Sequence, residues 1–239
     1  WDHAPGALIT REAGGVLRSF SFWTVVLIAL GLVALAAVPP PTPVYPLTRV
    51  VINATSQFEI VLALVLIYFP AELVWRDRGY RMQDILDTTP TPNWVFVSSK
   101  LGALWLVLFA ICAVCTLAAI GVQFIRGASW ADVELSLYLR RTFFFSFYGA
   151  VLVSILSVFF QTVTNNRYAG MLAMIVFSAG LSAALSALGL EHNLLHYSGA
   201  PAAPYSDMNG DGHFLVAHAW FRFYWTLFAG LLVVLTIAL

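Results

Sequence analysis

Long apolar runs alternate with polar segments along the whole chain. Six of these runs carry few charged side chains and come close to the roughly 20 residues that an α-helix needs to cross a bilayer. They lie at about residues 19–38, 57–75, 101–125, 142–161, 168–190 and 220–239. The pattern therefore predicts an all-α integral membrane protein with six transmembrane helices, arranged as a single unit over residues 1–239.

The segment before the first run mixes charged and apolar residues. Residues 1–18 alternate these types at a spacing typical of an interfacial helix, which we expect Gly14 and Gly15 to break or soften. The chain opens at Trp1 without a methionine and stops inside an apolar run. We therefore expect it to be an excerpt of a longer protein.

The most charged part of the chain lies between the second and third runs. The charged island, defined as Glu72–Lys100, holds eight of the 24 charged side chains. Arginine or aspartate at the centre of a bilayer costs about 2.5–3.5 kcal/mol on insertion scales. The charged island is therefore expected to be a solvated connection between two membrane helices.

Inside the charged island, apolar positions recur at helical spacing. Met82, Ile85 and Leu86 fall on one face, while Arg78, Arg81 and Asp84 lie largely elsewhere. The proline-rich stretch 88–92 should end this helix, because residues before proline avoid the helical region. A short amphipathic helix along the membrane face is predicted, and on pattern alone a plain interfacial loop without a partner fits as well.

The charged island also resembles a segment of a known family, the ABC type-2 export permeases, at their first cytoplasmic loop. The residues that carry the resemblance are Glu72, Arg76, Gly79, Ile85, Leu86, Thr89, Pro90 and Lys100. In that family this loop forms a coupling helix that docks on the ATPase subunit. The resemblance implies coupling roles for Glu72, Arg76, Arg78, Gly79, Arg81, Met82, Ile85 and Leu86.

A second segment extends this resemblance. Residues 192–214 are similar to the same region of bacterial permeases that are fused to a zinc aminopeptidase of the gluzincin class. Taken together, the two segments make nearly the whole chain resemble one permease unit. The chain differs from those fused proteins because it contains no peptidase domain.

Composition excludes several classes of function. The chain is 60% hydrophobic, only 10% charged and formally neutral, so it has no basic surface for nucleic acid. Its single lysine, Lys100, has no glycine-rich loop before it, whereas a phosphate-binding P-loop needs both. If ATP powers transport, ATP and magnesium must therefore bind to a partner subunit, and we expect no cofactor in this chain.

Two motifs suggest metal binding without completing it. His192 and His196 are four residues apart, which on a helix would place both on one face, but the order H-E-x-x-H is absent. Asp207, Asn209 and Asp211 resemble the start of a calcium loop, yet His218 stands where a bidentate glutamate belongs. We favour a structured loop without metal, and we interpret Cys112 and Cys115 as small packing residues.

The fifth run carries a stripe of small polar residues. Ser178, Ser182 and Ser186 follow one another at four-residue steps beside alanines. Small residues at this spacing let helices approach closely, and the same hydroxyls can instead line a polar path. We favour helix packing and keep the pathway as the alternative.

The orientation follows from the charge count and from the family. A cytoplasmic charged island places seven arginine and lysine residues inside and five outside, in weak agreement with the positive-inside rule. The resemblance implies both termini in the cytoplasm of a bacterial inner membrane, an ABC ATPase partner, a second permease unit and surrounding lipid. Two other hypotheses are a multi-helix anchor for a fused peptidase and, more remotely, an intramembrane metalloenzyme that uses His192 and His196.

Overall fold

The computed structural model describes residues 5–37, 52, 58–79, 92–125, 129–190, 192–201, 203, 210–212 and 214–239. Within these residues the chain forms helices and turns and contains no strand, which confirms the all-α prediction. The longer helices are α1 (Pro5–Leu17), α2 (Phe20–Ala37), α4 (Phe58–Gly79), α6 (Asn93–Ile125), α8 (Tyr148–Val163), α9 (Arg167–Ile175) and α11 (Phe214–Ala238). The shorter ones are η1 (Trp130–Asp132), α7 (Leu135–Leu139), η2 (Arg140–Phe147), η3 (Val176–Gly180), α10 (Leu181–Ala187) and η4 (Asn193–Leu195).

Four helical runs are long and apolar enough to cross a membrane. They are 93–125, 135–163, 167–187 and 214–238, and α1 with α2 makes a fifth if that bent pair counts as one span. α4 is not among these runs, and it contains Pro70 in its interior. The chain therefore has four to five helices that could span a membrane, as in a membrane protein. Six transmembrane helices remain a prediction.

The N-terminal helix breaks at a different place from the one expected. α1 continues through Gly14 and Gly15, and the chain turns by 65° between α1 and α2 instead. Ser19 causes this break, because its hydroxyl donates to the carbonyl of Val16 at 2.7 Å and accepts from the amide of Phe22 at 3.2 Å. The Ser19 hydroxyl stabilises the start of α2, which favours a helix boundary there. The two glycines weaken α1 only modestly, so the helix continues through them.

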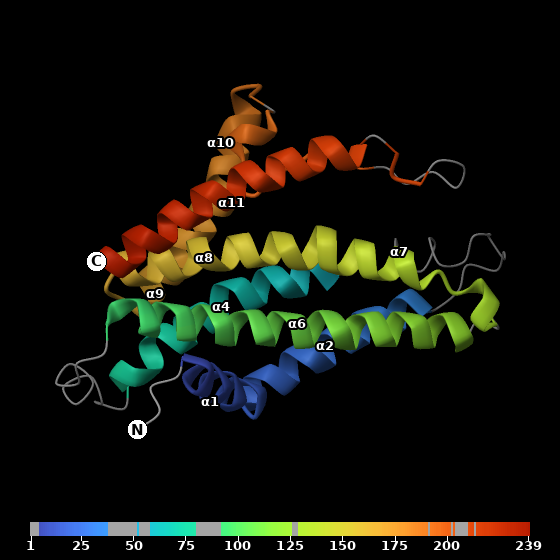
Figure 1. Cartoon of the computed structure of the whole chain (residues 1–239), viewed down its shortest axis with the longest axis horizontal. Helices are drawn as coiled ribbons and strands as arrows, with labels where there is room; N and C mark the ends of the chain where they lie inside the picture. The colour runs from blue at the N-terminus through green and yellow to red at the C-terminus, as the bar shows by residue number, and fades with distance from the viewer. Residues whose placement is uncertain are drawn as a thin grey trace. The chain divides into compact units, whose positions relative to one another are not determined.

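The chain divides into two compact units. The first unit comprises Trp1–Leu66 and Ser98–Val151, and the second comprises Ile67–Val97 and Leu152–Leu239. In the first unit α2 and α6 run side by side (Figure 1), and Val33 of α2 packs with Ala119, Val122 and Tyr138. The amide of Gln123 in α6 is fully buried and ties this core to the next segment, because it accepts from the Tyr138 hydroxyl and donates to the Asp132 carbonyl, both at 3.0 Å.

Two of the apolar runs contain π-helical turns. η2 connects α7 to α8, and η3 connects α9 to α10, so each pair forms one continuous helical run. The second of these runs begins at the Asn166 cap, whose side chain accepts from the amides of Tyr168 and Ala169. It ends where Gly189 adopts a positive φ of 70°, a conformation that glycine takes up without strain.

Candidate functional site

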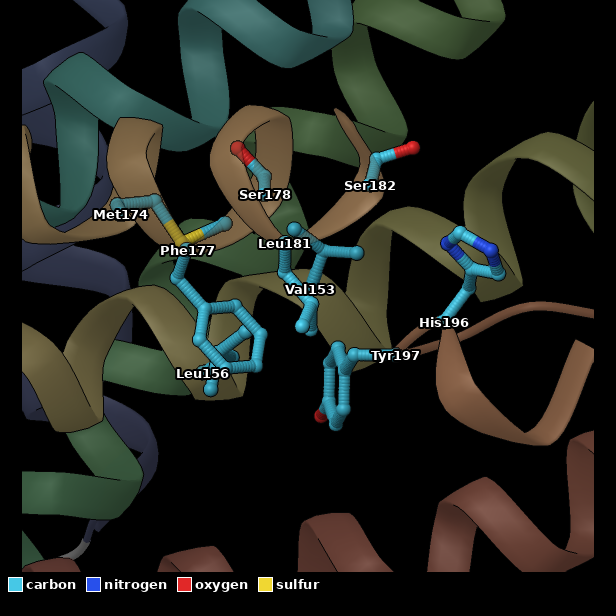
Figure 2. Close-up of a pocket in the computed structure, with 9 residues that line it drawn as sticks. All are labelled: Val153, Leu156, Met174, Phe177, Ser178, Leu181, Ser182, His196 and Tyr197. Atoms are coloured by element: carbon cyan, nitrogen blue, oxygen red, sulfur yellow. The ribbon is translucent and has the colours of Figure 1, made fainter. Parts of the chain in front are cut away.

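The second unit contains a small cavity against the serine stripe. The cavity measures about 130 Å³ and lies between α8, the α9–η3–α10 run and the segment around His196. Its lining residues are Val153, Leu156, Met174, Phe177, Ser178, Leu181, Ser182, His196 and Tyr197. Figure 2 shows Met174, Phe177 and Leu156 grouped on one side and His196 on the other. The cavity therefore combines an apolar side with a polar edge.

The three serines of the stripe do not share one environment. Ser178 and Ser182 line the cavity, whereas Ser186 is exposed and does not. Ser178 belongs to η3 and Ser182 to α10, and Ser186 lies one turn farther along α10, next to its end at Ala187. The choice between helix packing and a pathway remains a prediction.

Tyr197 closes one side of the cavity and is fixed in place. Its hydroxyl donates to the carbonyl of Leu152 at 2.8 Å, and its ring meets that of Trp225 at 5.1 Å, edge to face. Desolvation by burial raises the pKa of this hydroxyl above its ordinary value, so the proton stays on the oxygen at neutral pH. Tyr197 therefore acts as a hydrogen-bond donor that anchors the 192–201 segment.

Three residues of α11 hold the same segment from the other direction. His218, Arg222 and Trp225 lie one turn apart in succession, so they share one face of the helix. The Arg222 guanidinium donates to the Ser198 hydroxyl at 2.7 Å and carbonyl at 3.3 Å, and the Trp225 indole donates to the Gly199 carbonyl at 2.9 Å.

His218 completes this contact and has a defined tautomer. Its Nε2 accepts from Arg222 Nε at 3.1 Å, so its proton lies on Nδ1, which is 3.2 Å from the Pro201 carbonyl. The backbone is tight here as well. A Cβ on Gly199 would lie 2.7 Å from the carbonyl oxygens of Asn193 and His196, which only glycine avoids. The 196–201 segment is thus a structured cap on the first turns of α11.

The two histidines do not have the helical geometry that a shared metal ion would need. The segment between them forms the short 3₁₀ turn η4, so His192 and His196 do not lie one turn apart on an α-helix. His192 instead accepts from the Leu194 amide through Nδ1 at 3.2 Å, while His196 lines the cavity. Among the described residues no group of three or more histidine, cysteine, aspartate or glutamate residues could hold a metal ion.

The other metal-like motifs have limited structural description. Asp207 and Asn209 lie outside the described residues, and Asp211 is almost fully buried in the turn before α11. Cys112 and Cys115 are free and buried within α6. Burial among the apolar residues of α6 agrees with their interpretation as packing residues.

The charged island is described only at its two ends. Glu72 and Arg76 belong to α4, whose backbone continues through Arg78 to Gly79, and α6 begins at Asn93. The remaining residues with predicted coupling roles lie outside the described residues: Arg81, Met82, Ile85 and Leu86. The amphipathic coupling helix therefore stays a prediction, while both flanking helices reach past their apolar runs into the charged island.

No protein-family model matches the chain, and neither a curated protein nor a solved structure does. The similarity to export permeases consequently rests on the residues quoted from the sequence alone.

Sequence reasoning missed the residues that shape the C-terminal cap. Tyr197, Arg222 and Trp225 were not singled out, although His218, Arg222 and Trp225 at steps of four and three provide a signal. Three hydrogen-bond donors on one face of an apolar helix indicate that this face packs against backbone carbonyl groups. The pattern identifies the face of the helix, but it does not identify the chain segment that packs there.

Proposed function

We propose that the chain is a permease unit of an ATP-driven ABC exporter with six transmembrane helices in a bacterial inner membrane. A separate ATPase subunit would bind ATP and magnesium, and a second permease unit would complete the transport path. The observation that carries the proposal is the charged island between two apolar helices, both of which extend into it as regular helix. An element that must transmit movement between subunits needs this kind of rigid connection.

The exposed apolar faces support a role inside a membrane and beside a partner. In the run 167–187, Leu172, Ile175 and Val176 are exposed, and in α11 Leu227, Leu231 and Val234 are exposed. Apolar surface of this extent is unfavourable in water, and it is expected on helices that face lipid or another membrane subunit. The cavity with Ser178 and Ser182 provides a polar position for a substrate on the path that the family resemblance implies.

The test of the proposal is the double substitution Ile85→Asp, Leu86→Asp in the full-length protein. If these residues enter a groove on the ATPase, two carboxylates there cost several kcal/mol, and each ~1.4 kcal/mol weakens association tenfold. ATPase copurification and transport-coupled ATP hydrolysis in the reconstituted complex should then fall together by more than about 100-fold.

The matched control is Gln83→Glu, which adds a negative charge to the same segment but outside the apolar stripe. This variant should retain association within a few-fold. Wild-type association and hydrolysis for the aspartate pair would contradict the proposal and favour the multi-helix anchor for a fused peptidase.

A further inference from the structure

Three buried side-chain atoms have no hydrogen-bond partner among the described residues. They are Glu72 Oε2, Gln161 Nε2 and Arg167 Nε. All three belong to the second unit, where the end of α4 meets the end of α8 and the start of α9. We call this place the α4–α8–α9 polar junction. Buried polar groups in proteins nearly always have a partner, so three such atoms in one place call for a physical explanation.

Contacts on both sides of Glu72 indicate that it lies on the face of α4 that meets α8 and α9. Tyr68, Glu72 and Trp75 follow one another at steps of four and three, so they lie along one face of α4. The Arg167 guanidinium carbon lies 5.6 Å from the centre of the Tyr68 ring. At the other end of the face, the Trp75 indole donates to Gln161 Oε1 at 2.9 Å. Glu72 therefore sits between the points at which α4 contacts Arg167 and Gln161.

The Gln161 side chain is held firmly in this position. It is only 1% exposed, and it lies so close to α9 that a Cβ on Gly170 would stand 2.5 Å from Oε1 and 2.8 Å from Nε2. Gly170 is one turn from Arg167 on the same helix. Because the Trp75 N–H can only donate, it fixes which end of the amide is the oxygen. The NH₂ group must then point away from Trp75, and it finds no acceptor among the described residues.

The three open positions define the chemistry of a ligand. Gln161 and Arg167 each offer an N–H donor, whereas Glu72 offers an acceptor oxygen. An anion would satisfy the donors but meet the Glu72 carboxylate, and a cation would meet the Arg167 guanidinium. A hydroxyl group matches all three, since its oxygen accepts two hydrogen bonds and its proton is donated to the carboxylate.

We propose that the α4–α8–α9 polar junction binds a neutral hydroxyl group that bridges Glu72, Gln161 and Arg167. The hydroxyl belongs either to a single water molecule or to a small neutral alcohol. Its role is to keep the two opposite charges apart while satisfying both, and so to join the end of α4 to the α8–α9 turn. This inference does not depend on the proposed transport function.

A high-resolution experimental structure of the full-length protein in lipid nanodiscs tests the site directly. Density is expected within about 2.6–3.2 Å of Glu72 Oε2, Gln161 Nε2 and Arg167 Nε. Density of one atom that survives delipidation identifies water, and larger density together with an added mass in native mass spectrometry identifies an alcohol. A direct Glu72–Arg167 ion pair, or an empty junction, would overturn the inference.

Variants separate the bridge from general packing. Glu72→Gln keeps an acceptor oxygen and should keep the density, whereas Glu72→Leu should lose it. Gly170→Ala should displace the Gln161 amide, abolish the density and lower the melting temperature by about 3–8 °C. Gly180→Ala is the matched control, because its Cβ would lie an ordinary 3.7 Å from Val176 and should change neither property. Retention of the density in Glu72→Leu or Gly170→Ala would also overturn the inference.

Discussion

Arg222 shows how one side chain can organise a whole loop. Its guanidinium donates to the hydroxyl and the carbonyl of Ser198 and to His218, and His218 in turn contacts the Pro201 carbonyl. The Trp225 indole adds a hydrogen bond to the Gly199 carbonyl from the same helix. Hydrogen bonds from a charged group contribute about 1.5–3 kcal/mol each, so a few of them are enough to order a short segment.

Arg222→Met should therefore release the 196–201 segment while α11 stays helical. We expect amide hydrogen exchange in this segment to become about 10- to 100-fold faster, which corresponds to the loss of one or two charged hydrogen bonds. The measurement is exchange mass spectrometry on the purified full-length protein. Phe223→Leu, at an exposed neighbouring position, should exchange like wild type, and equal rates in Arg222→Met would show that Tyr197 and Trp225 suffice.

At the scale of helices, the apolar runs predicted where each helix lies in the sequence, but they did not predict the residues at which the helices begin and end. All six predicted runs are helical over most of their described residues, because a sustained apolar stretch can satisfy its backbone in a membrane only as a helix. The ends differ because hydropathy marks what lies in lipid, whereas the helix continues into polar sequence. α6 begins at Asn93 instead of residue 101, and the fourth run begins at Leu135 instead of residue 142.

The cavity could not be predicted from hydropathy or residue spacing. It needs Val153 from α8, Ser182 from α10 and Tyr197 from the loop to meet, and no local pattern encodes that meeting. Two serines of the stripe, Ser178 and Ser182, are among its lining residues, whereas Ser186 is exposed and does not line it.

The contact between α6 and α7 offers a test of a buried polar link. Gln123→Leu removes the acceptor of the Tyr138 hydroxyl and the donor to the Asp132 carbonyl. The buried Tyr138 hydroxyl, once it has lost its acceptor, costs about 1–3 kcal/mol, so the melting temperature should fall by roughly 2 °C or more.

The double variant Gln123→Leu, Tyr138→Phe checks the cause. It removes the orphaned hydroxyl, so it should be less destabilised than the sum of the two single variants. Additive effects of the two substitutions would indicate that their hydrogen bond contributes nothing to stability.

At the scale of the whole molecule, contacts within the second unit place two polar connections at one end of that unit. Trp75 near the end of α4 bonds to Gln161 near the end of α8, and Arg167 at the start of α9 lies over Tyr68. The charged island and the 164–166 turn therefore leave the helices at the same end of this unit. The count of positive residues alone separated the two sides only weakly.

Topology can be measured with single cysteine probes in a Cys112→Ala, Cys115→Ala background. A membrane-impermeant thiol reagent should modify a cysteine at Ser206 in intact cells and one at Gln83 only after permeabilisation. The charge bias and the family resemblance both predict this result. Labelling of Gln83 but not Ser206 in intact cells would reverse the orientation.

The length of α6 has a mechanical consequence. At 1.5 Å per residue its 33 residues form a rod of about 50 Å, against a hydrocarbon layer of about 30 Å. A continuous helix moves as a rigid lever arm. A force applied at Asn93 is therefore transmitted to Ile125, because no loop between them can bend. A small tilt at the end beside the charged island becomes a displacement of several ångströms at the opposite face of the membrane.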